Sequence, residues 1–113
     1  MTVPADAAAL GEIVIYQSAD GASTIDVRLD GDTVWLTQAQ MAELFERDQS
    51  VVARHIRNAI EDHEVEPDRS MQILHKSLSE RGTAYYDLDV VISVGYRVRS
   101  LRGVQFRRWA TTV

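Results

Sequence analysis

The stretch TQAQMAELFERDQSVVARHIRN, Thr37 to Asn58, decides the fold that the sequence predicts. Thr37 is suited to cap a first helix, because its hydroxyl can accept a hydrogen bond from amides that lack partners at a helix start. Residues 38–45 follow without Gly or Pro, and their apolar side chains recur at helical spacing. Residues 46–48 are polar and suit a tight turn. We therefore predict a helix over residues 38–45, followed directly by a turn.

A second helix is predicted from Gln49 to about His63, because apolar residues recur there at helical spacing. Its apolar face comprises Val52, Ile56, Ala59 and Ile60. Two helices joined by a three-residue turn cross steeply, so the second helix can project its other face outward. Glu46 occupies the turn position where glycine is frequent, and we expect it to adopt the left-handed conformation with some strain.

The outward face of this second helix carries donors whose length suits base edges and phosphates, with one small residue that permits close approach. Its residues are Gln49, Ser50, Ala53, Arg54, Arg57 and Asn58. The pattern therefore predicts a helix-turn-helix that reads duplex DNA. The alternative for the same residues is an ordinary helical hairpin inside an α+β core, with a solvated polar face.

Two strands are predicted before this helical pair, over residues 12–18 and 24–30, because apolar and polar residues alternate there. Residues 19–22 carry a turn signal between them, so the strands form an antiparallel hairpin with one buried face. We interpret this hairpin as a cover for the core. A contact with the DNA backbone is disfavoured, because Asp20 and Asp32 would repel phosphate.

A short third strand is predicted over residues 33–36, after a tight turn at residues 30–32. This strand leads directly into the cap of the first helix. We expect it to deliver Trp35 to the core beneath that helix.

A second hairpin is predicted after the helical pair, over residues 71–77 and 83–87. The intervening residues 62–69 are acidic and contain Pro67, which disfavours helix at the residue before it. The hairpin tip carries His75, Lys76 and Arg81, so it is more cationic than the first hairpin. It follows the helix-turn-helix at the place where a wing would lie.

The segment from Val90 to Val94 is almost entirely apolar and β-branched, so periodicity alone leaves buried strand and buried helix both open. Asp87 as a cap and Asp89 in a first turn favour helix, because acids there complement the helix dipole. Ser100 is suited to cap a last helix. One face of that helix carries Phe106, Trp109, Ala110 and Val113.

Charge is distributed unevenly along a chain whose net charge is −5. Residues 1–46 contain eight acidic residues and one arginine, whereas residues 47–113 contain nine acidic and eleven basic residues. This asymmetry would allow an oriented approach to DNA, and equally a head-to-tail contact with another protein. The last predicted helix and its approach carry Arg99, Arg102, Arg107 and Arg108. These arginines would meet phosphate, or form a solvated face with their stems packed on the core.

The length of 113 residues suits one core, and we expect a single winged-helix-like α+β domain over residues 12–113 after a flexible tail of residues 1–11. The absence of cysteine favours a cytoplasmic protein. No apolar run approaches the roughly 20 residues that span a bilayer, so no membrane partner is expected. Because the chain stops within apparently helical sequence, we expect it to be the N-terminal part of a longer protein.

Residues with catalytic or metal-binding chemistry form no recognisable constellation. His55 and His63 lie about two turns apart on the predicted helix, but the sequence has no cysteine and no HExxH spacing. No strained elbow sequence surrounds Ser50, and Gly95 and Gly103 are isolated, so no phosphate-binding loop is predicted. We therefore expect no enzyme activity, no metal and no cofactor.

Three stretches resemble the RhuM family, a bacterial family often described as virulence-associated. They are WLTQAQMAELF at residues 35–45, YDLDVVISVGYRV at residues 86–98 and RGVQFRRWAT at residues 102–111. The resemblance covers nearly everything from about residue 12 to residue 113. It implies a DNA-binding domain, often encoded near mobile elements and restriction systems, within usually longer proteins. It implies no reaction and no catalytic residue.

The leading expectation is thus regulatory binding of duplex DNA through the helix-turn-helix, by a homodimer because one small unit buries limited surface. The expected DNA-binding residues are Gln49, Ser50, Arg54, Arg57, Asn58, Arg99, Arg102 and Arg107. The alternative is a protein-interaction adaptor, similar to phage antirepressor modules, that engages a repressor or toxin. A third reading is a domain that only positions a C-terminal region outside this sequence.

Overall fold

The structure is a computed structural model that describes residues 12–18, 20–21, 23–30, 33–74, 82–99 and 101–112. Three strands come first: β1 (Glu12–Gln17), β2 (Thr24–Asp30) and β3 (Thr33–Leu36). Helices α2 (Gln38–Phe45), α3 (Gln49–Glu61) and the short α4 (Pro67–Ser70) follow. The chain then forms β4 (Met71–Leu74), β5 (Thr83–Asp87), α5 (Leu88–Val98) and α6 (Leu101–Thr112). The α+β class and the order of elements agree with the sequence prediction.

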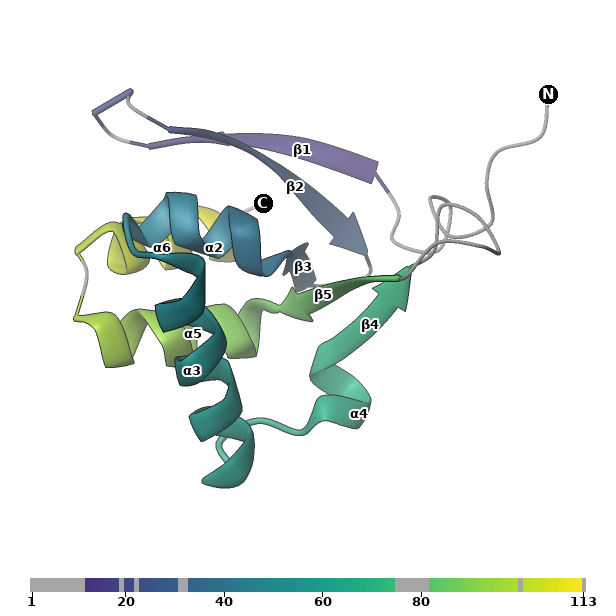
Figure 1. The fold of residues 1–113 in the computed structure, drawn as a ribbon. Helices are drawn as coiled ribbons and strands as arrows, with labels where there is room; N and C mark the ends of the chain where they lie inside the picture. Colours follow the sequence, from purple (N-terminus) through teal and green to yellow (C-terminus); the bar gives the residue numbers. More distant parts are fainter. Residues whose placement is uncertain are drawn as a thin grey trace, which may run out of the picture.

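The strands form one antiparallel sheet in the order β1-β2-β3-β5-β4. The pairing of β3 with β5 joins segments far apart in sequence, because Trp35 lies opposite Asp87 and Leu36 opposite Tyr86 (Figure 1). Helices α2, α3 and α4 are therefore inserted between two strands that are neighbours in the sheet. Both ends of the helical insertion are therefore attached to the same sheet.

The core lies between the inner face of the sheet and the helices α2, α3, α5 and α6, which gather on one side of the strands (Figure 1). The sheet contributes alternating residues such as Ile25, Val27 and Leu36, as expected for one buried face. The helices contribute Met41, Leu44, Phe45, Val52, Ile56, Val90, Val91, Val94 and Phe106. Tyr16 of β1 packs edge-on against Phe106, with ring centroids 5.0 Å apart. The first hairpin thus covers the core, as predicted.

The predicted position of Trp35 was wrong in one respect. Trp35 is buried, but it does not belong to the core cluster that contains its neighbours Val34 and Leu36. Successive side chains of a strand point to opposite faces, so Trp35 lies on the other face of the sheet, opposite Arg28 and Asp87. Val34 and Leu36 fill the place beneath α2 instead.

The segment from Val90 to Val94, which the sequence left open between strand and helix, lies within α5. The Asp87 carboxylate accepts a hydrogen bond from the Val90 amide at 3.3 Å, as expected of a cap. Burial is the largest influence on Asp87 and raises the pKa of its carboxyl above the ordinary value. The apolar run is helical because this cap precedes it and because α5 packs on both α3 and α6.

Two boundaries differ from the prediction. Helix α3 ends at Glu61 and not at His63, which adopts a left-handed conformation with φ of 60°. The expected break over residues 62–69 contains the start of α4, with Pro67 in its first turn, where its missing N–H leaves no bond unmade. The predicted cationic hairpin tip, the N-terminal tail, the turn at Gly31 and Asp32, the Ser100 cap and Val113 lie outside the described residues.

Helices α5 and α6 approach closely at Gly95 and Gly103, beside the ring of Phe45. A Cβ atom built on Gly103 would lie 2.9 Å from Phe45 Cε1 and 3.3 Å from the Gly95 Cα. This close contact explains two glycines that the sequence showed only as isolated. Within the described residues, no helix combines the length and apolar character needed to cross a bilayer.

Candidate nucleic-acid interface

Helix α2 begins with a complete capping box. The Thr37 hydroxyl accepts from the Gln40 amide at 3.1 Å, and the Gln40 side chain accepts from the Thr37 amide at 2.9 Å. The Gln40 side-chain amide also donates to the Asp26 carbonyl of β2 at 2.6 Å. The predicted N-cap is therefore confirmed, and the same glutamine fastens the start of α2 to the first hairpin.

The turn between α2 and α3 depends on a left-handed residue. Glu46 has φ of 55° and ψ of 50°, the conformation expected at the place where glycine is frequent. The Arg47 amide reaches back to the Ala42 carbonyl at 3.0 Å, so the turn closes the end of α2. Asp48 then precedes α3 in an extended conformation. This geometry determines the direction in which α3 leaves α2.

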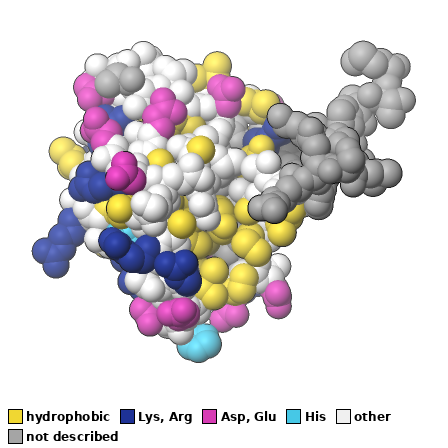
Figure 2. Space-filling view, viewed as in Figure 1, with side chains coloured by type: hydrophobic (Ala, Val, Ile, Leu, Met, Phe, Trp, Pro, Cys, Tyr) yellow, Lys and Arg dark blue, Asp and Glu magenta, His cyan; other side chains and the backbone are white. Residues whose placement is uncertain are grey.

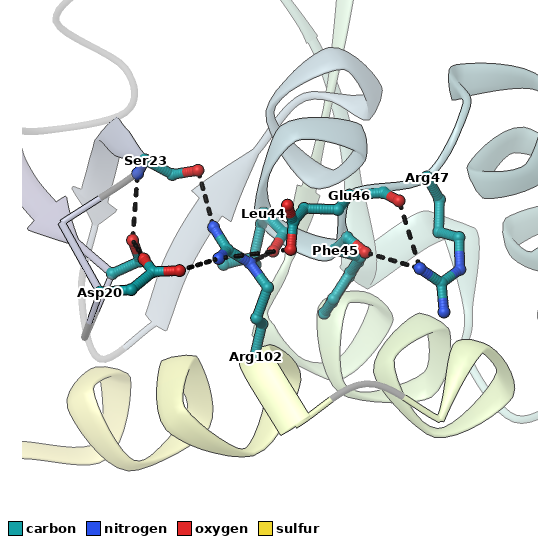
Figure 3. A network of polar contacts seen from close by, with 8 residues as sticks. Asp20, Ser23, Leu44, Phe45, Glu46, Arg47 and Arg102 are labelled. Atoms are coloured by element: carbon teal, nitrogen blue, oxygen red, sulfur yellow. Dashed lines mark hydrogen bonds and ion pairs between the residues drawn. The ribbon is translucent and has the colours of Figure 1, made fainter.

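Arg47 links the ends of two helices, a role that the sequence analysis missed. Its Nη1 donates to the Phe45 and Glu46 carbonyls, both at 3.2 Å, and its Nη2 donates to the Val98 carbonyl at the end of α5 at 3.3 Å. Carbonyls at helix ends lack intrahelical donors and favour a cation. An arginine directly after a predicted helix end was the available signal. Figure 3 shows Arg47 on the side of Phe45 and Glu46 opposite to Arg102.

Arg102 has a structural role, because its side chain links three parts of the fold. Its Nε donates to the Leu44 carbonyl at 2.6 Å and its Nη2 to the Ser23 hydroxyl at 2.7 Å, while Nη1 lies 3.2 Å from a carboxylate oxygen of Asp20 (Figure 3). Nη1 also lies 3.5 Å from a carboxylate oxygen of Glu46, and only 13% of the arginine side chain is exposed. Arg102 thus fastens α6 to α2 and to the turn of the first hairpin, and we leave it out of the proposed DNA contacts.

Helix α3 presents two different faces. Its apolar face is anchored, because Val52, Ile56 and Ala59 are buried against a core shared with α2 and α5. Its opposite face holds the residues predicted from the sequence: Gln49, Ser50, Arg54 and Arg57 are exposed, and Ala53 and Asn58 are partly exposed. The structure therefore brings these six residues together on one accessible face of one helix.

The charge on α3 changes sign along its length. Figure 2 shows Lys and Arg side chains gathered over the middle of α3, with acidic side chains beyond them near its end. At that end, Arg97 Nη2 of α5 contacts Asp62 at 2.9 Å and Glu64 at 2.6 Å. These hydrogen bonds raise the pKa of Arg97 above its ordinary value. The cationic part of the face is therefore the middle of α3, which carries Arg54 and Arg57.

His55 lies on the flank of α3 and is partly buried, and its Nδ1 atom has no hydrogen-bond partner among the residues that the structure describes. Burial, followed by the nearby charges of Arg54 and Arg97, lowers the pKa of His55 below its ordinary value of 6.5. The imidazole is therefore neutral at neutral pH. Within the described residues, no three His, Asp or Glu side chains are grouped in a way that could hold a metal ion.

Three further arginines from the sequence analysis lie on or next to the two C-terminal helices. Arg99 is exposed and left-handed, with φ of 52°, and it follows Val98, whose carbonyl binds Arg47 of the α2–α3 turn. Arg99 therefore lies beside that turn. Arg107 is partly buried and donates to the Tyr96 hydroxyl at 3.3 Å, whereas Arg108 is exposed.

The geometry indicates the class of this protein. It is a small α+β domain with an antiparallel sheet, in which two helices joined by a tight turn present a polar face. Comparison with known families then narrows the class. Residues 66–113 match the model of the Virulence protein RhuM family. The match supports the resemblance to this family over α4, the second hairpin and the two C-terminal helices, and it does not extend to residues 35–45. Searches of curated proteins and of solved structures found no significant match.

Proposed function

We propose that this domain binds duplex DNA and that the exposed face of α3 contacts the major groove. The observation that carries the proposal is the pairing of an anchored apolar face with an exposed face of Gln49, Ser50, Arg54 and Arg57 on one helix. A helix of this kind fits the width of the major groove, where each base pair presents a distinct pattern of donors and acceptors. A regulatory role is the consequence that such binding would have.

The side chains on α3 divide into two roles by their position. Gln49, Ser50 and Arg54 belong to the first two turns of the helix and would reach base edges, as the start of a recognition helix does. Arg57 and Asn58, one turn further along, would contact phosphate together with Arg99 beside the α2–α3 turn. The acidic end of α3 would be held away from the DNA backbone, because its carboxylates repel phosphate.

The proposal is tested by fluorescence anisotropy with a labelled duplex of mixed sequence, at low and then moderate salt. We expect salt-sensitive binding, because each neutralised phosphate contributes about 0.9 to the slope of log affinity against log salt concentration. The variant Arg54→Ala/Arg57→Ala should lose most of this binding. At a preferred site, Arg54→Ala alone should weaken binding by about 1–3 kcal/mol.

The matched control is Arg69→Ala/Arg108→Ala, which removes the same charge from exposed residues outside α3. Circular dichroism verifies that every variant is folded. If both double variants lose the same amount of DNA affinity, the loss comes from the change in net charge, and a specific role for α3 is contradicted. Absence of binding at low salt by the folded domain would contradict the proposal itself.

A protein-binding adaptor, which engages a repressor or toxin, is the second candidate. The observation that favours it is a group of exposed apolar side chains outside α3, including Tyr96 and Leu101. Salt separates the two functions, because DNA binding weakens steeply as salt rises, whereas a largely apolar protein contact changes little.

A further inference from the structure

The outer face of the first hairpin carries a patch that is apolar in the middle and acidic at its edge. Ile13 and Ile15 of β1 are 52% and 63% exposed. Ile15 lies directly opposite Asp26 of β2, and Asp30 follows on the same face at the spacing of the pleat. We call Ile13, Ile15, Asp26 and Asp30 the hairpin patch. The strand that carries its isoleucines is at the edge of the sheet.

The one arginine opposite this patch already has partners. Arg28 lies opposite Ile13 on the same face, but its guanidinium lies 5.5 Å above the ring of Tyr85 and its Nε donates to the Tyr85 hydroxyl at 3.3 Å. Arg28 is therefore drawn toward β5. Arg28 keeps its charge beside Tyr85, and the two aspartates outweigh it, so the charge of this face is negative on balance.

A second exposed apolar patch lies on α5 and α6, and it is edged by arginines. Tyr96 and Leu101 are 70% and 71% exposed, and Val104 is also exposed. Leu101, Val104 and Arg108 recur at helical spacing on one face of α6, and Arg107 reaches Tyr96. We call Tyr96, Leu101, Val104, Arg107 and Arg108 the helix patch. A long apolar side chain exposed in isolation needs no explanation, whereas a cluster with a charged edge indicates an interaction surface.

The helix patch contains a hollow of about 90 Å³, lined by Ile92, Gly95, Tyr96, Gly103, Val104 and Arg107. The two glycines line it where α5 and α6 approach each other closely. Its size suits one aliphatic side chain, such as an exposed isoleucine of the hairpin patch. Arg107 at its border would then lie near the acidic edge of that patch.

We propose that the hairpin patch of one copy docks on the helix patch of a second copy, head to tail. Both patches belong to the same chain, they are apolar at the centre, and they carry opposite charges at the edge. A contact between two identical patches would place arginines against arginines or aspartates against aspartates, which is unfavourable. The pairing of unlike patches is therefore preferred, and a pair of docked copies retains one free hairpin patch and one free helix patch unless the assembly closes. Neither patch uses the exposed residues of α3.

The experiment uses sedimentation velocity of the domain over a wide range of concentration, with two double variants. The hairpin variant is Ile15→Thr/Asp26→Lys, and the helix variant is Leu101→Gln/Arg108→Glu. We expect self-association of the unaltered domain, and association at least about tenfold weaker in each variant, because each loses an apolar contact and reverses a charge. The control Arg69→Glu changes an exposed arginine outside both patches and should associate normally.

Mixing the two variants distinguishes a head-to-tail contact from a symmetric one. The hairpin variant retains an intact helix patch, and the helix variant retains an intact hairpin patch. We therefore expect an equal mixture, with one variant fluorescently labelled, to form a complex of two chains. Asp26→Lys and Arg108→Glu singly provide the same mixing test if a double variant fails to fold.

Three results would overturn the proposal. The first is a domain that remains monomeric at every concentration, in which case another protein covers these patches. The second is self-association that neither variant weakens. The third is association that only one of the two variants weakens, since that outcome indicates contact between like patches, or association that both variants lose and that mixing does not restore. DNA binding by α3 is measured separately, so failure of one proposal leaves the other open to its own test.

Discussion

At the scale of single residues, Phe45, Gly95 and Gly103 lie in close contact where α5 and α6 meet. The ring of Phe45 is fully buried and has no room to move away from a new atom. A Cβ atom on Gly103 would lie only 2.9 Å from this ring, whereas one on Gly95 would lie at an ordinary 3.5 Å. The two glycines look alike in the sequence but differ in what surrounds them.

We predict that Gly103→Ala lowers the free energy of unfolding by about 1–3 kcal/mol, because overpacking forces the ring and the two helices apart. Gly95→Ala is the matched control. It should leave stability unchanged or raise it by up to about 1 kcal/mol, since alanine favours helix. Urea denaturation measures both. Equal stability of the two variants would show that the helices can separate at no cost.

A second prediction at the scale of single residues concerns His55 and the pH dependence of stability. Burial lowers the pKa of His55 in the folded state below the value of 6.5 that it has when unfolded. The unfolded chain therefore binds more protons than the folded chain below about pH 6.5, so stability is complete above that pH and declines as pH falls. We expect the urea midpoint to fall between pH 7.5 and 5.5, and to fall less in His55→Gln.

His63 provides the control for this pH dependence, because it is exposed on the turn after α3. The variant His63→Gln should retain the decline of the unaltered domain. If His55→Gln loses no part of the pH dependence, protonation of His55 does not destabilise the fold.

At the scale of elements, the helical pair is held by arginines from its own turn and from α6. Arg47 binds the ends of α2 and α5, and Arg102 binds the end of α2 and the turn of the first hairpin. These contacts supply donors to carbonyls that the helices leave unpaired. They also explain how the direction of α3 is maintained after a turn that contains no glycine.

We predict that Arg102→Ala lowers the free energy of unfolding by about 2–4 kcal/mol. The substitution leaves the Leu44 carbonyl without its charged donor and removes the packing of a mostly buried side chain. Arg108→Ala, on the exposed face of the same helix, should change stability by less than about 0.5 kcal/mol. Thermal and urea denaturation compare the two. A similar loss in both would indicate that the effect comes from charge and not from the contacts of Arg102.

At the scale of the whole molecule, the pairing of β3 with β5 makes the sheet and the helices one structure. The helical insertion leaves the sheet after β3, and the chain returns to pair beside it in β5. Tyr16, Phe106 and Trp109 join the first strand to the last helix, with the Tyr16 ring 5.0 Å from both other rings. The first strand and the last helix therefore cannot separate without exposing part of this shared core.

We predict that the domain unfolds in a single cooperative transition, and its two tryptophans can report on it. Trp35 lies in β3 and Trp109 in α6. Variants Trp109→Phe and Trp35→Phe leave one fluorescent reporter each. Within each variant, the fluorescence midpoint in urea should equal the midpoint by circular dichroism, because small single domains unfold in two states. Different midpoints within one variant would show that the sheet and α6 unfold separately.

The sequence predicted those features that depend on residues close together in the chain. The strands of the first hairpin, the cap at Thr37 and both helices of the pair were predicted close to their observed bounds. The exposed face of α3 followed from helical spacing alone, so those candidate residues were found together. Arg102, in contrast, was assigned to DNA contact because its partners, up to 82 positions away in sequence, cannot be inferred from spacing.

The sequence by itself determined the elements, because capping, turn conformation and the periodicity of apolar residues act between neighbours a few positions apart. It also indicated an apolar face for α2, α3 and α6, whereas α4 was not predicted and the α5 segment was left open between strand and helix. The tertiary structure alone decided that Trp35 turns away from the core, that Arg102 serves the fold, and that Gly95 and Gly103 meet at Phe45. Each of these outcomes depends on segments brought together by sheet pairing and helix packing, and their relative placement is not encoded in any local pattern.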